Sequence, residues 1–464
     1  MVRKRERNVR LAALITEANC SHTQLAAAFV RVALENNARE FAGVARSHIS
    51  HWVCGTRPSG RAPALLCETL SRRLGRIVTP EEIGLAAEPD SPSGADWCTD
   101  TLAALADLGS VDLDLERRTL LGATAYSVAG LALPGDAWWQ RMAERGTGRS
   151  AVGAHRVGRG DLETVRDMVA VFSRMDQRRG GGHGHTAVVQ YLVSDVAGCL
   201  SGTFVDGRVR RGMFSAASEL TYLAGWMAFD NAEHSIAQRY FTLAVKLAAE
   251  ADDAPMAGHV LRAMAHQALD VGHPRSALDL ATASVDGKRY IGATPRERAL
   301  LGVVHARGLA AVGEKTAAAS ALLRAEDDLA SARLGDDEPR RAFFFQEASL
   351  AHETACALRD SGDVQGAERE FRRSVRTRKV AAFTRTHAVT LGYLGSVQLV
   401  QGNFEEARAT WSRALDTMDG VRSGRTRRTA WDIRTGLSPF RRRGMREAAE
   451  LDARARAYLE ERQT

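Results

Sequence analysis

Residues 395–415 read GSVQLVQGNFEEARATWSRAL, and this stretch has the pattern of two short helices joined by a tight turn. Small residues stand at Gly395, Ala407 and Ala414, and Gly402 separates the two apolar runs. Small side chains let antiparallel helices approach closely, and a glycine at the turn supplies the positive φ that ends the first helix. The stretch therefore predicts a helical hairpin whose inner faces meet at these small residues.

Four further segments follow the same spacing, at 225–245, 265–285, 306–326 and 355–375. Each begins with a small residue, has a turn residue seven positions later, and has small residues five and twelve positions after the turn. The five turn residues are Ala232, Gly272, Gly313, Gly362 and Gly402. The pattern resembles the tetratricopeptide repeat (TPR), although the segments recur at offsets of 40, 41, 49 and 40 residues, against about 34 for the standard unit. The resemblance implies stacked helix pairs that form a superhelix with a concave groove.

The rest of the body also has helical signals. Apolar residues recur three and four positions apart, and strand signals are nearly absent from about residue 98 onward. We therefore expect an all-α body, with further helix pairs before residue 225 and after residue 420. The alternative is an irregular helical domain, which the recurrence of small residues in register argues against. Glycine-rich breaks interrupt the pattern at 144–160 and in RRGGGHGH (178–185).

Positive charge is concentrated at the N-terminal end of the chain. Residues 1–86 hold 13 Lys and Arg against 7 Asp and Glu, whereas the remaining residues hold 50 against 49. A cationic unit attached to a neutral body indicates an anion-binding module, with nucleic acid as the first candidate partner. Residues 88–96 (EPDSPSGAD) combine prolines, serines and acids, which indicates a linker after this module.

The N-terminal module has helical signals at about 5–19, 22–37, 46–54 and 62–76. Ser21 and Gln24 have the spacing of a capping box at the start of the second segment. In the third segment, Ile49, Trp52 and Val53 fall on one helical face at spacings of three and four. The residues left for the other side are Arg46, Ser47, His48, Ser50 and His51. We expect the apolar face to be buried and the polar flank to face outward.

Residues 47–58 (SHISHWVCGTRP) resemble the signature of the XRE (lambda-repressor-like) helix-turn-helix family. The resemblance covers about 80 residues and implies that Ile49 and Trp52 anchor a recognition helix that Gly55 ends. The DNA contacts that it implies are Arg46, Ser47, His48 and His51 to bases, and Gln24, Ser50 and Arg57 to phosphates. The start of such a helix can enter the major groove and reach base edges. The chain departs from the family at 36–44, where a longer connection replaces the usual tight turn.

Other basic residues of the module can also meet phosphates and release counterions. They are those within 3–10, together with Arg61, Arg72, Arg73 and Arg76. The alternative for the module is a small helical domain that mediates oligomerisation.

The order of the parts resembles a group of actinobacterial transcription regulators that act on differentiation and secondary metabolism. The resemblance implies a helix-turn-helix domain over 1–87, a linker over 88–97, a helical middle region over 98–213 and a TPR-like α-solenoid over 214–464. One interpretation of the middle region is that it contains degenerate repeats. The implied function is a cytoplasmic, DNA-binding transcriptional regulator that forms a homodimer on a palindromic operator. Its repeats would bind a small-molecule or peptide ligand, a protein partner or the second subunit. The alternative is a TPR interaction scaffold whose helix-turn-helix module does not bind DNA.

Signals for other chemistry are weak. Residues 146–160 are glycine-rich but lack the G-K-[ST] ending and a preceding strand, so we expect no nucleotide loop there. His183 and His185 lack a third ligand nearby, which favours a polar loop over a metal site. No catalytic motif appears, so we expect no enzyme activity, no cofactor and no metal. The basic run at 422–444 is interpreted as a solvated helix face that caps the repeats, with a DNA or partner contact as the alternative.

Membrane and disulfide chemistry are not expected either. No run of about 18 uncharged apolar residues is present, which predicts no transmembrane helix and no membrane partner. Six cysteines are scattered without paired spacing, a pattern typical of buried small hydrophobes in a reducing compartment. They are Cys20, Cys54, Cys67, Cys98, Cys199 and Cys356.

Overall fold

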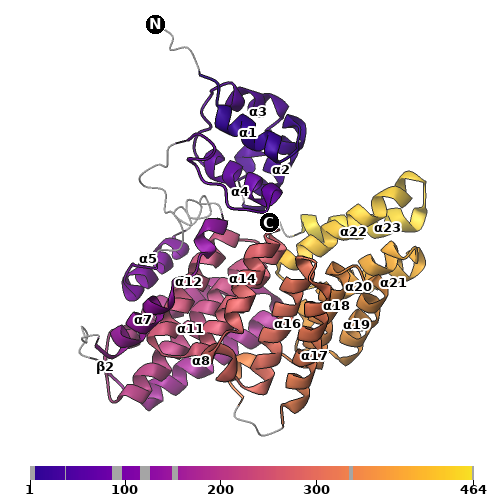
Figure 1. Ribbon diagram of the computed structural model, residues 1–464. Coiled ribbons are helices and arrows are strands. Elements are labelled where there is room, and N and C mark those ends of the chain that lie inside the picture. The colour runs from indigo at the N-terminus through magenta and orange to yellow at the C-terminus, as the bar shows by residue number, and fades with distance from the viewer. Residues whose placement is uncertain are drawn as a thin grey trace.

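The regular structure is almost entirely helical, and an N-terminal module stands on one side of a larger helical body (Figure 1). The computed structural model describes residues 6–36, 38–85, 97–114, 126–148, 155–333 and 338–461. Apart from Trp97, the expected linker at 88–97 lies outside these residues, as does part of the glycine-rich run at 146–160. Among the described helices, none is long and apolar enough to cross a bilayer.

The four helices expected in the N-terminal module are present. They are α1 (Val9–Glu17), α2 (His22–Glu35), α3 (Arg46–Val53) and α4 (Ala62–Leu74), with a 3₁₀ turn η1 (Arg39–Phe41) in the long connection before α3. The predicted capping box is confirmed, because the Gln24 N–H donates to the Ser21 hydroxyl at 3.2 Å and the Ser21 N–H donates to the Gln24 carbonyl oxygen at 2.9 Å. Apolar residues from all four helices form one core, with Leu25, Phe29 and Ile49 fully buried.

The middle of the chain contains shorter helices and the two strands of the described structure. The helical elements are α5 (Thr101–Leu113), η2 (Val128–Leu131), α7 (Asp136–Gly148), α8 (Arg159–Arg179), η3 (Gly181–His183), α9 (His185–Tyr191), the π-helical turn η4 (Leu192–Val196) and α10 (Ala197–Leu200). Strands β1 (Arg156–Val157) and β2 (Thr203–Phe204) pair in parallel. The sequence predicts a purely helical body, and this pair of two-residue strands corrects that expectation. The pairing includes a hydrogen bond from the Thr203 N–H to His155 O at 2.8 Å.

The C-terminal part of the body is an array of paired antiparallel helices. The pairs are α11 (Gly207–Asp230) with α12 (His234–Glu250), α13 (Ala254–Asp270) with α14 (Pro274–Ser284), α16 (Pro295–Ala311) with α17 (Lys315–Ser331), α18 (Glu347–Asp360) with α19 (Val364–Thr377), α20 (Thr384–Val400) with α21 (Phe404–Thr417), and α22 (Gly424–Arg442) with α23 (Arg446–Glu460). A short helix α15 (Lys288–Ile291) and a 3₁₀ turn η5 (Arg340–Ala342) lie between pairs. Each helix packs most extensively against its own partner, so the array is a TPR-like helical repeat.

The turn residues behave as the sequence predicts. All five have positive φ, between 64° at Ala232 and 89° at Gly272 and Gly313. Alanine at 232 adopts the same left-handed conformation as the glycines, at the energetic cost that a Cβ carries there. A further turn of this kind, with φ of 80°, lies at Gly444 between α22 and α23. Its buried small residues Ala448 and Ala455 come one position early, and Leu437 and Arg456 stand where the other pairs have small residues.

The small residues are the points where paired helices touch. The ten small residues that follow the turns, such as Ala237 and Ala414, are all buried. A Cβ on Gly225 would lie 2.8 Å from the Phe241 ring, and one on Gly395 would lie 2.5 Å from the Trp411 ring. Only glycine therefore lets these aromatic side chains pack between the helices.

The array does not end as an open superhelix, because the loop between α21 and α22 returns to the end of α8. The Arg422 N–H donates to Arg179 O at 2.7 Å, and the Gly182 N–H donates to Arg422 O at 3.0 Å. A Cβ on Gly180 would overlap Arg422 O, and one on Gly181 would overlap Met227 O. The glycines of RRGGGHGH therefore allow the backbone at 180–182 to lie close to the backbones of Met227 and Arg422.

Two minor expectations are wrong. His185 is not in a polar loop: it is buried at the start of α9, its Nε2 lies 2.8 Å from Asp112 Oδ2, and the Tyr240 hydroxyl donates to the same oxygen at 2.6 Å. Only Cys67 and Cys356 of the six cysteines are buried, while Cys54 and Cys98 are exposed. Burial raises the pKa of the Cys67 thiol to about 12, so this residue is an inert core side chain.

Candidate nucleic-acid interface and central pocket

Helix α3 lies at the end of the N-terminal module that points away from the body, and α4 lies at the end next to the body (Figure 1). The inner face of α3 is anchored as expected. Ile49 is fully buried, and the Trp52 ring packs edge-on against the Phe29 ring with centroids 5.3 Å apart. This packing fixes the rotation of α3 about its axis and thereby decides which residues face outward.

The outward flank of α3 is polar. Arg46, Ser47, His48 and His51 are exposed, and Ser50 is half-buried. The His48 Nδ1 accepts a hydrogen bond from the Ala45 N–H at 3.1 Å, so this ring caps the start of the helix and is not wholly available for a ligand. The four exposed residues form one surface, which we call the α3 flank.

The other predicted contact residues lie outside α3. Arg57 is exposed in the loop that follows. Gln24 lies at the start of α2, where its carbonyl oxygen is used in the capping box described above. Gly55 ends α3 with a φ of 97°, and a Cβ there would overlap the carbonyl oxygen of Glu6. Glycine at 55 is therefore required both by the backbone conformation and by the N-terminal segment that crosses it.

Three arginines proposed as phosphate contacts are already paired with acids. Arg72 contacts Glu35 and lies 2.7 Å from Glu68, and Arg76 lies 2.7 Å from Glu82 and 3.1 Å from Glu17. Arg61 lies 3.5 Å from Glu40 and donates to Asn36 O at 2.6 Å. These residues stabilise the module and are not free cations, which corrects the expectation for them.

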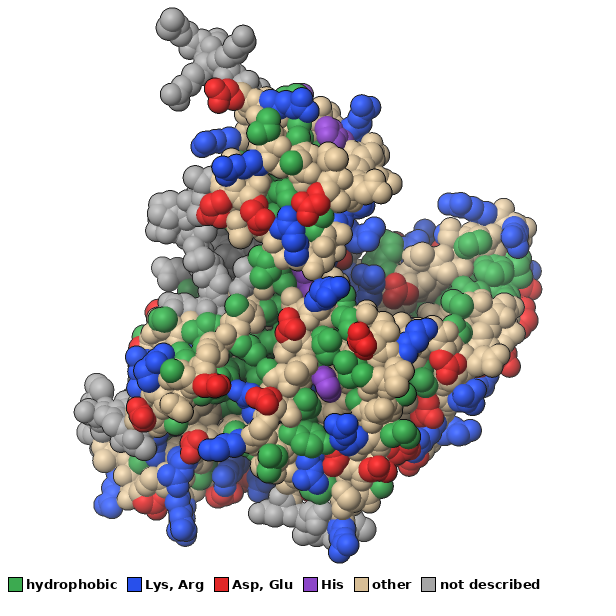
Figure 2. Space-filling view, in the orientation of Figure 1, with side chains coloured by type: hydrophobic (Ala, Val, Ile, Leu, Met, Phe, Trp, Pro, Cys, Tyr) green, Lys and Arg blue, Asp and Glu red, His purple; other side chains and the backbone are tan. Residues whose placement is uncertain are grey.

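The distribution of charge on the module agrees with these pairings. In Figure 2, blue Lys and Arg side chains and a histidine lie over the upper part of the module, around the α3 end. Red acidic side chains gather on its lower part, toward the body. One further acidic side chain lies at the top edge beside the grey residues, but most of the acids visible in this view lie away from the α3 end, where Lys and Arg predominate.

The module joins the body through a buried polar cluster. His273, before α14, places its Nε2 2.7 Å from Glu68 Oε1 on α4, and both side chains are buried. The Tyr126 ring stacks on His273 at 5.9 Å, and the Tyr126 N–H donates to Asn36 Oδ1 at 3.1 Å. Burial raises the pKa of Glu68, but hydrogen bonds and charges from His273 and Arg72 outweigh burial, and the net direction is downward.

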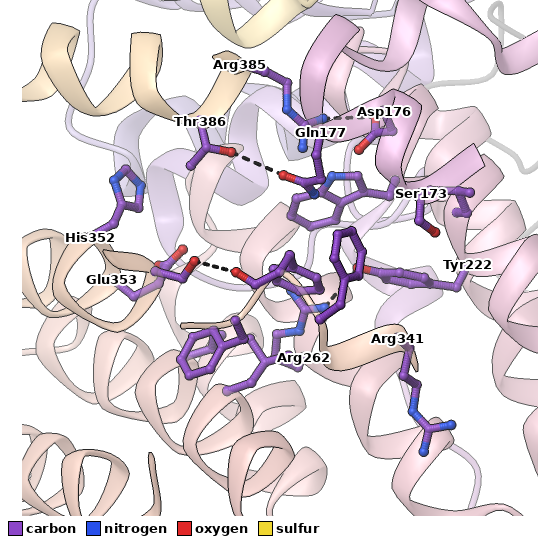
Figure 3. A pocket seen from close by; sticks show the side chains of 18 of the residues that line it. Ser173, Asp176, Gln177, Tyr222, Arg262, Arg341, His352, Glu353, Arg385 and Thr386 are labelled. Carbon is purple, nitrogen blue, oxygen red and sulfur yellow. Dashed lines mark hydrogen bonds and ion pairs between the residues drawn. The ribbon is translucent and has the colours of Figure 1, made fainter. Parts of the chain in front are cut away.

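The second candidate site is a pocket inside the helical array. Its walls come from α8 and from the first helices of the successive pairs, α11, α13, α16, α18, α20 and α22. The pocket is partly open to solvent and leaves about 80 Å³ for the centres of water-sized molecules. Figure 3 shows side chains from these separate helices converging on one space. The concave side of the array is therefore the side that bears the pocket, as in helical repeats generally.

One wall of the pocket is not made by a helix. Phe343, Phe344 and Phe345 follow η5 and line the pocket beside Tyr222 and Trp226. This segment lies in the longest of the repeat offsets, the 49 residues between the third and fourth segments. The irregular offset was the one sequence signal that could have located the pocket.

Some charges of the pocket are paired within the protein. Arg385 lies 3.0 Å from Asp176 and 3.3 Å from Asp230. The Thr386 hydroxyl donates a hydrogen bond to Gln177 Oε1 at 3.5 Å (Figure 3). Burial raises the pKa of Asp176 to about 6, although Arg385 acts in the opposite direction. Such ion pairs join α20 to α8 and hold the ring of helices closed.

Other arginines of the pocket lack a carboxylate partner. Arg262 and Arg378 are buried and Arg425 is half-buried, and the Nε atom of each is enclosed without a hydrogen-bond partner among the described residues. No carboxylate of the described structure lies within ion-pair distance of any of the three. The expectation that 422–444 is only a solvated face is therefore wrong for Arg425, which lines the pocket.

The histidines around the pocket are neutral. Burial lowers the pKa of His259, His266 and His352 well below the usual range, and neighbouring guanidinium groups lower it further. No three His, Cys, Asp or Glu side chains in the described ranges are grouped to hold a metal ion. The cationic groups of the pocket are therefore its arginines.

Comparison with known proteins gives two findings. The SP15 N-terminal domain family matches residues 11–86, which span the helices of the N-terminal module. A solved signal-transduction ATPase with numerous domains (STAND), which carries a tetratricopeptide-repeat sensor and comes from Pyrococcus horikoshii, aligns over 87% of this chain and 71% of its own, at 10% identity and a TM-score of 0.39. No curated protein matches the chain.

Proposed function

We propose that this protein is a DNA-binding transcriptional regulator whose helical array acts as the sensor or partner-binding part. The observation that carries the proposal is the α3 flank. An arginine, a serine and two histidines are exposed at a helix whose opposite face is locked by Ile49 and Trp52, on the end of the module away from the body. A short helix presented in this way can enter the major groove, where arginine recognises guanine.

The residue roles follow from position. Arg46, Ser47, His48 and His51 would face base edges, and Ser50, Arg57 and Gln24 would contact phosphates. A cytoplasmic homodimer would place two such helices on a palindromic operator. The array, joined to the module through Glu68 and His273, would bind a ligand or partner and bias the placement of the two modules.

The test is selection of bound duplexes from a random library with the full chain, followed by anisotropy titration of the enriched sequence. Arg46→Ala is expected to weaken specific binding by about 1–3 kcal/mol. Arg446→Ala is the matched control, because Arg446 is 88% exposed on α23 at the far end of the array. Enrichment of no sequence, with no duplex binding at low salt, would favour the alternative of an interaction scaffold.

A further inference from the structure

The three arginines of the pocket that have no carboxylate at ion-pair distance act on the same two histidines. Two of these arginines also make hydrogen bonds within the protein, Arg262 to the Tyr222 hydroxyl at 2.9 Å and Arg378 to Ala348 O at 2.7 Å. Arg378 and Arg425 both lower the pKa of His352, and Arg262 and Arg425 both lower the pKa of His266, after the dominant effect of burial. Electrostatic influence of this kind is strong only at short range in a protein interior. All three arginines also line the same pocket, although they come from three different parts of the array.

The acids that line the pocket form their ion pairs with other arginines. Glu353 lies 3.3 Å from Arg307, Glu219 lies 3.3 Å from Arg341, and Asp176 is held by Arg385. Burial lowers the pKa of Arg378 to about 10, and the charge of Glu353 offsets only part of that effect. Burial also acts to lower the pKa of Arg425, but Tyr393 and the more distant charges of Asp270, Asp230 and Glu353 outweigh burial and the net direction is upward. Because no carboxylate of the described residues lies at ion-pair distance from these three groups, the site can receive the negative charge of a ligand.

The remaining lining is aromatic. Tyr222 and Trp226 form one side, with Arg262 over the Trp226 ring at 5.5 Å from its centroid, and Phe343 and Phe344 form another. The indole N–H of Trp226 has no hydrogen-bond partner among the described residues. A pocket that combines apolar walls with a few convergent donors selects a ligand that has an apolar body and one polar head.

We propose that this pocket binds a small organic anion, with a carboxylate or phosphate head held by Arg262, Arg378 and Arg425 and an aromatic body packed among Tyr222, Trp226 and Phe344. The inference rests on the proposed role of the array as a ligand sensor and names the chemical class of its ligand. Guanidinium groups suit both kinds of head, because they donate two parallel hydrogen bonds to either.

The test is calorimetric titration of the full chain, without DNA, with two aromatic series. The carboxylate series is phenylacetate and indole-3-acetate, and the phosphate series is phenyl phosphate and 1-naphthyl phosphate. Neutral analogues, the corresponding acetamides and aryl alcohols, are the controls. Binding by either series above its neutral analogues is the expected result, and the tighter series identifies the head group.

Arg425→Met is the decisive variant, because the Arg425 side chain makes no hydrogen bond to any described residue. It should weaken anion binding by about tenfold or more, the equivalent of one charge-assisted hydrogen bond. Arg425→Lys should restore part of the affinity. Arg422→Met, an exposed arginine three residues earlier, is the matched control and should bind like the wild type.

Two results would overturn the proposal. One is that no anion of either series binds more tightly than its neutral analogue. The other is that Arg425→Met and Arg422→Met bind equally well. Neither measurement uses DNA, so a failed duplex selection with retained anion binding would remove only the DNA-binding proposal, and the converse result would remove only this one.

Discussion

His273 Nε2 lies 2.7 Å from Glu68 Oε1, across 205 residues of sequence, and this buried contact joins the helical array to the N-terminal module. Arg72 contacts the same carboxylate from within α4, and Tyr126 stacks on the imidazole from the other side. The module is thus held on the body by α4, the helix opposite the α3 flank.

Glu68→Gln should loosen the junction. The substitution removes the charge that faces His273 and Arg72 inside a buried site, and we expect a loss of about 2–3 kcal/mol in unfolding free energy by chemical denaturation. Glu17→Gln breaks the exposed contact with Arg76 and should cost less than about 1 kcal/mol. Equal losses for the two variants would show that the junction contributes no more than a surface ion pair.

The protein should lose stability in mild acid because of its buried histidines. Burial lowers the pKa of His234 to about 4. His234 therefore takes up a proton near pH 6.5 in the unfolded chain but only near pH 4 in the folded chain. The free energy of unfolding falls as the pH drops from about 6.5 to about 4. His234→Gln should reduce the slope of unfolding free energy against pH between 6 and 4.5 by up to about 1.4 kcal/mol per pH unit. A slope for His234→Gln equal to that of the wild type would contradict the prediction.

The turn residues predict a reciprocal pair of substitutions. Ala232 has a φ of 64°, so Ala232→Gly should stabilise the protein by about 1 kcal/mol in thermal or chemical unfolding. Gly402 has a φ of 85° and open space around its Cβ direction, so Gly402→Ala should destabilise by a similar amount through conformation alone. A stabilising Gly402→Ala would contradict the conformational argument.

Arg57 should control the salt dependence of DNA binding. If it contacts a phosphate, Arg57→Ala should reduce the slope of log affinity against log salt by about 1, with little change in sequence preference. Arg76→Ala serves as the comparison because Arg76 is already paired with Glu17 and Glu82. The measurement is anisotropy at four or more salt concentrations, and an unchanged slope for Arg57→Ala would remove it from the contact surface.

The sequence carried most of the information about the helix pairs. Close packing at Gly225 and Gly395 and the left-handed turns at Ala232 and Gly402 are local requirements, and each leaves a small residue at a fixed spacing. The same holds for α3, because Ile49 and Trp52 recur at the helical period and Gly55 follows them. The spacing pattern does not extend to α22 and α23, since the buried small residues Ala448 and Ala455 lie one position before the places where the other pairs have them.

By itself, then, the sequence determined the helical repeats and the apolar and polar faces of α3, because these depend on residues a few positions apart. Only the tertiary structure decided that the array closes on Gly180 and Gly182, that His273 meets Glu68, and that Arg262, Arg378 and Arg425 share one pocket. Such contacts depend on the curvature that accumulates over many helix pairs. Since no local spacing records that curvature, arginines 47 and more residues apart gave no sign that they would converge.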